Sequence, residues 1–165
     1  MATPCPQLQH LPDNVKAFWE DKQRDLDDTL LLFSYSIMAT LPNFPFPEIT
    51  GILYLMQRDL WFEDFPKPPL FFLNRPSKYQ KTLIQIPRTS ITEVQLLRQS
   101  ALEAMLRGTP QQTPEFLRKL SRFFSRDPYY LLVTGVSMAG KAFQYAFREV
   151  NDPDAWLQTL QGKHP

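Results

Sequence analysis

Residues 51–64 read GILYLMQRDLWFED and span most of two apolar runs, residues 49–56 and 60–65. Only residues 57–59, which are polar, separate the two runs. Apolar runs of this length around a short polar spacer are typical of two antiparallel strands joined by a tight turn. The sequence therefore predicts a β-hairpin, and its neighbours indicate the class of sheet to which it belongs.

Further strand-forming segments lie on both sides of this hairpin. They are residues 30–41, 82–86, 90–96, 129–134 and 141–148. Their content of β-branched and aromatic residues favours strands. We expect residues 82–96 to form one strand bent at Pro87. Residues 70–73, which lie among prolines, predict an edge strand.

Helical periodicity occurs in three places. Residues 14–26 predict a short polar helix or coil, and residues 99–126 predict a helical insertion between strands. At the C-terminal end, Asp152 followed by Pro153 predicts the start of a helix in which Trp156 faces the core. Gly162 stands where such a helix should end.

The order of these elements resembles that of GRAM domains, which are of the pleckstrin-homology-like kind. The resemblance rests on residues 51–64, on IPRTSITEV at 86–94, and on the final strand and helix. It implies an α+β fold, a bent antiparallel β-barrel closed by a C-terminal helix. The helical insertion, about residues 98–126, departs from the family pattern. We expect residues 1–28 to be an N-terminal extension and residues 29–165 to be the domain.

Composition narrows the class of function. The formal net charge is only +1, which argues against a nucleic-acid binder that neutralises phosphates. The single cysteine, Cys5, cannot form an internal disulfide, and this suits a reducing compartment. No export signal is visible in residues 1–11. We therefore expect a cytoplasmic protein, either free or peripheral to a membrane.

The resemblance implies a platform that binds proteins or membrane lipids. We expect a non-catalytic adaptor domain that needs no cofactor and binds a protein partner, with a membrane surface as one setting. The candidate binding residues are basic side chains of the insertion and two aromatic side chains of a proline-rich loop. They are Arg118, Lys119, Arg122, Arg126, Phe44 and Phe46.

An alternative is a peripheral module that binds anionic lipid, such as a phosphoinositide, through Arg118, Lys119 and Arg122, with Phe44 and Phe46 as apolar anchors. Polyphosphate head groups need several converging cations. Residues 40–50, the loop that supplies them in many pleckstrin-homology domains, contain no Lys or Arg. Phosphoinositide binding at that position is therefore not expected.

A third alternative, an enzyme or nucleotide binder, is suggested by GVSMAGK at residues 135–141, which matches the phosphate-binding pattern G-x-x-x-x-G-K. The next residue is Ala142, where the pattern needs Ser or Thr to hold magnesium. We interpret the segment instead as a hairpin turn whose glycines supply positive φ.

The sequence offers little for catalysis. Its two histidines, His10 and His164, lie near opposite ends of the chain, and Cys5 lies in a segment expected to be disordered. Glu63 and Asp64 are adjacent in a predicted strand, so their side chains should point to opposite faces. We expect these acids to be structural or solvated, and we expect neither an active site nor a metal.

Overall fold

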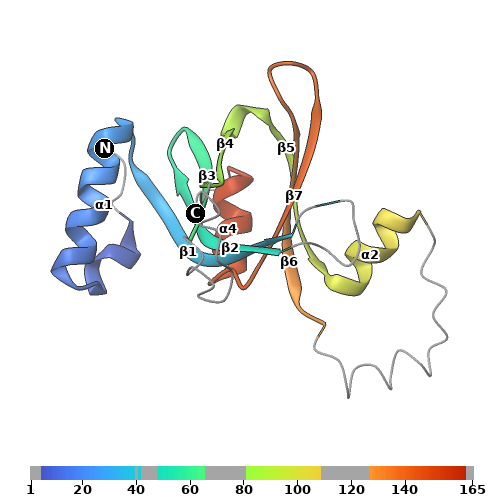
Figure 1. Ribbon diagram of the computed structural model, residues 1–165, viewed down its shortest axis with the longest axis horizontal. Helices are drawn as coiled ribbons and strands as arrows, with labels where there is room; N and C mark the ends of the chain where they lie inside the picture. Colours follow the sequence, from blue (N-terminus) through green and yellow to red (C-terminus); the bar gives the residue numbers. More distant parts are fainter. Residues whose placement is uncertain (1–4, 40, 42–47, 66–80, 109–126, 163–165) are drawn as a thin grey trace, which may run out of the picture. The chain divides into compact units, whose positions relative to one another are not determined.

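The computed structural model describes residues 5–39, 41, 48–65, 81–108 and 127–162, and Figure 1 shows its elements. The helices are η1 (Pro6–His10), α1 (Asp13–Leu26), η2 (Arg88–Ser90), α2 (Gln99–Arg107) and α4 (Pro153–Leu160), of which η1 and η2 are short 3-10 helices. The strands are β1 (Leu30–Ala39), β2 (Glu48–Met56), β3 (Asp59–Asp64), β4 (Leu83–Pro87), β5 (Ile91–Arg98), β6 (Tyr129–Val136) and β7 (Ala142–Arg148). In this part of the chain no helix has the length and apolar character needed to cross a bilayer.

The strands form one antiparallel sheet in the order β4-β3-β2-β1-β7-β6-β5. The prediction of an α+β fold with an antiparallel sheet is confirmed. The prediction of a barrel is wrong for the described residues, because β4 and β5 end the order and do not pair with each other. The expected bent strand at residues 82–96 is in fact two strands. Pro87 lacks an N–H with which to continue a ladder, and η2 follows it.

Two compact units divide the chain, and the boundary falls within β1 and β2. The first unit comprises Met1–Tyr35 and Thr50–Thr89. The second unit comprises Ser36–Ile49 and Ser90–Pro165. Each is described by itself.

In the first unit, α1 covers part of one face of the strands. Trp19 is fully buried, and its ring centroid lies 4.8 Å from that of Phe33 and 5.5 Å from that of Tyr54. Asp27 ends the helix in the left-handed conformation with φ 47°. Cys5 is 2% exposed in the same core, so the expected disorder of its segment is wrong. The nearby apolar residues Leu8 and Leu11 pack against the same core, and burial of this apolar surface favours an ordered segment.

In the second unit, β5, β6 and β7 form antiparallel pairs, α4 contacts β5, and α2 contacts β5 and β6. Trp156 of α4 is fully buried, as predicted. The Asp152 carboxylate accepts a hydrogen bond from the backbone N–H of Ala155 at 3.3 Å and caps the helix. Near the other end, Gln161 Nε2 donates to the carbonyl oxygen of Val94 in β5 at 3.2 Å. The predicted terminal helix and its N-cap are therefore confirmed.

Both predicted hairpins are confirmed, although their details differ from the expectation. In the first, β2 pairs with β3 and Asp59 already belongs to the strand, so the turn is shorter than expected. In the second, Gly140 has φ +73°, but Gly135 does not lie in that region. A Cβ on Gly135 would lie 2.1 Å from the carbonyl oxygen of Ser90, the last residue of η2, and 2.4 Å from the ring of Phe143, so close approach of these neighbours is what requires glycine there.

Candidate functional site

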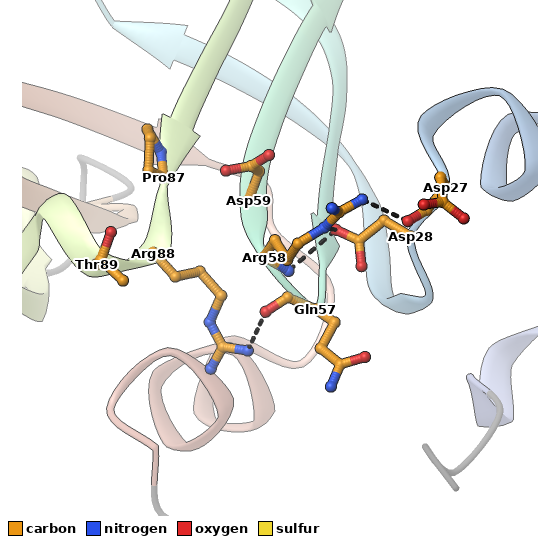
Figure 2. A pocket seen from close by; sticks show the side chains of 8 residues that line it. All are labelled: Asp27, Asp28, Gln57, Arg58, Asp59, Pro87, Arg88 and Thr89. Atoms are coloured by element: carbon orange, nitrogen blue, oxygen red, sulfur yellow. Dashed lines mark hydrogen bonds and ion pairs between the residues drawn. The ribbon is translucent and has the colours of Figure 1, made fainter.

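The first unit contains an open hollow where the turn of hairpin β2–β3 meets η2 and the segment after α1. We call it the charged hollow. Its volume is about 670 Å³. Its lining residues, drawn in Figure 2, are Asp27, Asp28, Gln57, Arg58, Asp59, Pro87, Arg88 and Thr89.

Arg58 points from the turn toward the end of α1 (Figure 2). Its Nη2 donates to the carbonyl oxygens of Leu26, at 3.0 Å, and of Asp27. Its Nε lies 3.5 Å from Oδ2 of Asp28. The guanidinium therefore satisfies carbonyl groups at the C-terminal end of α1, where positive charge also complements the helix dipole.

Asp28 and Arg88 hold the same turn from two other segments. The Asp28 carboxylate accepts hydrogen bonds from the backbone N–H groups of Thr29, at 2.8 Å, and of Arg58, at 3.0 Å. Arg88 donates from Nη1 to the carbonyl oxygen of Gln57 at 3.1 Å, and from its backbone N–H to that of Arg58 at 2.9 Å. The hydrogen bonds of the charged hollow join main-chain segments to one another. Its lining has three carboxylates and two guanidinium groups. The charged hollow therefore works as a structural junction.

A second group of charged side chains lies on the strands of the first unit, and we call it the Glu63 cluster. It consists of Lys22 from α1, Tyr54 from β2, Glu63 from β3 and Lys81. Lys22 Nζ and Tyr54 Oη both donate to Oε1 of Glu63. Lys81 Nζ donates to Oε2 at 2.6 Å. The Glu63 side chain is buried, so its charge is compensated at close range.

Two opposing effects set the pKa of Glu63. Burial by itself would raise the pKa of the carboxyl group, but the hydrogen bonds from Lys22, Lys81 and Tyr54 outweigh it and lower the pKa to about 2. Burial, followed by the hydrogen bond to Glu63, raises the pKa of the Tyr54 phenol. At neutral pH the carboxylate is ionised and the phenol keeps its proton. The cluster therefore fastens α1 to β3.

The neighbouring acid, Asp64, has a different partner. Its Oδ1 accepts a hydrogen bond from the backbone N–H of Thr82 at 2.9 Å, and the side chain is buried. Both acids of the adjacent pair therefore make structural bonds, as the sequence indicated.

The same unit exposes two stacked aromatic rings, which we call the aromatic pair. Tyr35 of β1 is 44% exposed and Phe65 is 43% exposed. Their ring centroids lie 6.1 Å apart with an interplanar angle of 17°. The backbone N–H of Phe65 donates to the carbonyl oxygen of Thr50 at 3.0 Å, so Phe65 extends the β2–β3 ladder beyond Asp64.

In the second unit, hairpin β6–β7 extends past the strand beside it. Ile91, the first residue of β5, lies opposite Gly135, whereas β6 and β7 remain paired as far as Val136 and Ala142. Figure 1 shows the closed end of this hairpin projecting beyond β5. We call residues 136–142 the hairpin tip. An open hollow of about 490 Å³ lies at its base, lined by Leu41, Thr92, Thr134, Gly135, Val136, Ala142, Phe143 and Gln144.

The segment that matches the phosphate-binding pattern lies at this tip. Strand β7 follows this segment. In a phosphate-binding loop, by contrast, a helix follows the pattern. The backbone N–H of Ser137 donates to the carbonyl oxygen of Lys141 at 2.9 Å, which closes the turn. The interpretation of residues 135–141 as a hairpin turn is confirmed.

The structure does not test the predicted binding residues. Phe44, Phe46, Arg118, Lys119, Arg122 and Arg126 all lie outside the described residues. The first part of the expected helical insertion is confirmed as α2, and residues 109–126 lie outside the description, as does the expected edge strand at residues 70–73. Within the described ranges, no three His, Cys, Asp or Glu side chains come together as a metal site.

Sequence reasoning missed the Glu63 cluster and the hairpin tip. Lys22 and Glu63 are 41 positions apart, and no local pattern links them. The tip did have a signal, since Val136 and Met138 are apolar residues within a predicted turn, where polar residues are usual.

Comparisons with known proteins add little to this description. No protein-family model matches the chain, and neither does any curated protein. Among solved structures, the chain is similar to the C-terminal domain of an unknown protein from Leishmania infantum, with 9% sequence identity and a TM-score of 0.45. The match covers 91% of this chain and 97% of that chain. A likeness at this level carries no argument about function.

Proposed function

We propose that the chain is a non-catalytic adaptor domain that binds another protein through the aromatic pair of the first unit. The observation that carries the proposal is the exposure of Tyr35 and Phe65 as two stacked rings. Tyrosine and phenylalanine offer large apolar areas with few rotatable bonds, and aromatic residues are enriched at protein interfaces. A partner that covers both rings gains this burial with little loss of conformational entropy.

The position of the pair supports this proposal. Tyr35 lies two residues after Phe33, and alternate residues of a strand point to the same face. Phe33 packs on Trp19 of α1. The helix therefore covers one end of an apolar strip, and Tyr35 continues the strip into solvent. A partner with an apolar anchor would extend a core that already exists.

The pleckstrin-homology-like class and a cytoplasmic location belong to the same proposal. The class is supported by the sequence order of antiparallel strands followed by the capped helix α4, and the location by the single cysteine, Cys5, which suits a reducing compartment. An adaptor role fits an open sheet that presents side chains on a rigid frame.

Site-specific photocrosslinking tests the proposal. The photoreactive residue p-benzoylphenylalanine replaces Tyr35 in one variant and Phe18 in a matched control. Phe18 is an exposed aromatic residue of α1 in the same unit. After irradiation in a lysate of the source cells, we expect one predominant protein adduct from position 35 and none from position 18. The Phe65→Ser substitution should weaken the adduct.

Two results would count against this function. One is the same set of adducts from both positions, which would indicate random collision. The other is an adduct that Phe65→Ser leaves unchanged while the variant remains folded by circular dichroism.

A further inference from the structure

Two backbone N–H groups in the first part of β1 are bonded to side chains of other segments. The N–H of Leu30 donates to Oε1 of Gln23 at 2.9 Å, and the N–H of Phe33 donates to Oε1 of Gln7 at 2.9 Å. Within the described residues, β7 pairs with β1 farther along, at residues 37–39. In a ladder, a strand N–H donates to the carbonyl oxygen of a neighbouring strand. Here the amide oxygens of two glutamine side chains take that position.

Gln7 belongs to a short segment that we call the η1 strap, residues 5–11. The backbone bonds of this segment stay within it. The N–H of Leu8 donates to the carbonyl oxygen of Cys5 at 3.1 Å, and the N–H of Leu11 donates to that of Leu8 at 3.3 Å. Among the described residues, the bond from Phe33 to Gln7 is therefore the one hydrogen bond that joins the strap to a strand. Without this bond, packing alone would hold the strap.

The strap packs on the core of the first unit through three apolar side chains. Cys5 is buried, whereas Leu8 and Leu11 are half-buried against the same core. Gln9 and His10 are exposed. Segments with few buried apolar contacts open at a lower free energy than the core does. The strap therefore has the properties of a segment that opens while the strands stay folded.

We propose that the η1 strap is a displaceable cover, and that the N–H of Phe33 then binds a main-chain carbonyl of an extended partner segment alongside β1. The Gln7 side chain ends in an amide, the same group as a peptide bond, so it already stands in for such a carbonyl. Extended segments that add to a sheet edge gain their affinity from main-chain hydrogen bonds. This proposal goes beyond the aromatic pair, because Phe33 can pair with a strand whether or not a partner covers Tyr35 and Phe65.

The stability of the closed strap sets how tightly such a segment binds. A partner that binds only the open state has an apparent dissociation constant equal to the intrinsic one divided by the open fraction. A substitution that weakens the closed strap should therefore strengthen partner binding by the same factor.

The first measurement is strap opening in the full chain. Cys5 is the single cysteine, so its alkylation by iodoacetamide, followed by mass spectrometry, reports opening directly. Burial raises the pKa of the Cys5 thiol, so the closed state reacts slowly. Gln7→Ala should increase the alkylation rate about ten-fold, because the strap loses its bond to Phe33, and the melting temperature should stay close to that of the parent. Gln9→Ala, at an exposed position of the strap, is the matched control and should leave the rate unchanged.

The second measurement uses a synthetic peptide of alternating valine and threonine with a lysine at each end. In NMR spectra of the isotope-labelled chain, we expect this peptide to shift the amide resonance of Phe33, and we expect it to accelerate the alkylation of Cys5. Gln7→Ala should bind the peptide about ten-fold more tightly than the parent does. The same peptide with methylated backbone nitrogens cannot form a ladder, so it should have neither effect.

Three outcomes would overturn the proposal. The first is equal alkylation of Cys5 in the parent and in Gln7→Ala. The second is a fall in the melting temperature of Gln7→Ala large enough for global unfolding to account for the faster alkylation, which would make the strap a fixed part of the fold. The third is a Phe33 resonance that the peptide leaves in place or that the methylated peptide shifts equally.

Discussion

Hairpins β2–β3 and β6–β7 are both antiparallel strand pairs joined by a short turn, but the surroundings of their turns differ. The turn of β2–β3 is bonded to Asp28, to Thr29 and to Arg88, all from other segments. The turn of β6–β7 bonds to itself and extends beyond β5. The first hairpin therefore ends in a junction, and the second ends in solvent.

This difference indicates which side chains stabilise the fold and which do not. Around β2–β3, charged side chains bond to backbone groups of other segments and to the buried Glu63 carboxylate, so their removal should affect folding. At the tip of β6–β7, the side chains have few neighbours, so their removal should affect contacts outside the molecule. The three predictions below test this division, beginning with the largest expected effect.

Glu63→Gln should lower the free energy of unfolding by about 3 kcal/mol at pH 7, which corresponds to the fall in pKa from 4.5 to about 2. The folded-state pKa is lowered, so this stabilisation is present above about pH 4.5 and is lost as the pH falls toward 2. Urea melts between pH 7 and pH 2 should show the difference between parent and variant shrinking in that window.

The control for this experiment is Glu20→Gln, at an exposed position of α1. It should change the unfolding free energy by less than about 0.5 kcal/mol. A constant difference between the parent and Glu63→Gln down to pH 2 would show that ionisation of Glu63 is not what fastens α1.

Asp28→Ala should destabilise the first unit by about 2 kcal/mol, because the backbone N–H groups of Thr29 and Arg58 lose their acceptor. Asp25→Ala, at an exposed position on α1, is the matched control and should have little effect. Amide hydrogen exchange should also accelerate in the turn of β2–β3. If Asp28→Ala melts like the parent, the turn is held by the strands alone and the comparison of the two hairpins fails.

Gly140→Ala should lower the free energy of unfolding by about 1 kcal/mol, because φ +73° is unfavourable for a residue with a Cβ. No heavy atom lies within 4 Å of the added Cβ, so the effect is one of backbone strain without a clash. Thermal melts measure it, with Ala139→Ser as a control in the same turn. A stabilised Gly140→Ala protein would contradict the conformation of this turn.

Much of the local structure could be predicted from the sequence. Both hairpins follow from apolar runs around short spacers, and α4 follows from Asp152, Pro153 and the spacing of Trp156, since these signals act within a few residues. The positive φ of Gly140 was also predictable, because glycine is the residue that tolerates it most readily.

The pairing of distant segments was decided only by the tertiary structure. Residues 82–96 have the composition of one bent strand, yet β4 pairs with β3 and β5 pairs with β6. Lys22 became a partner of Glu63 because α1 packs over the sheet through Trp19, and Tyr54 reaches Glu63 because β2 pairs with β3. Ladder partners and buried ion pairs depend on which surfaces meet. Each depends on the sum of many weak apolar contacts along the whole chain, and no short stretch of sequence encodes that sum.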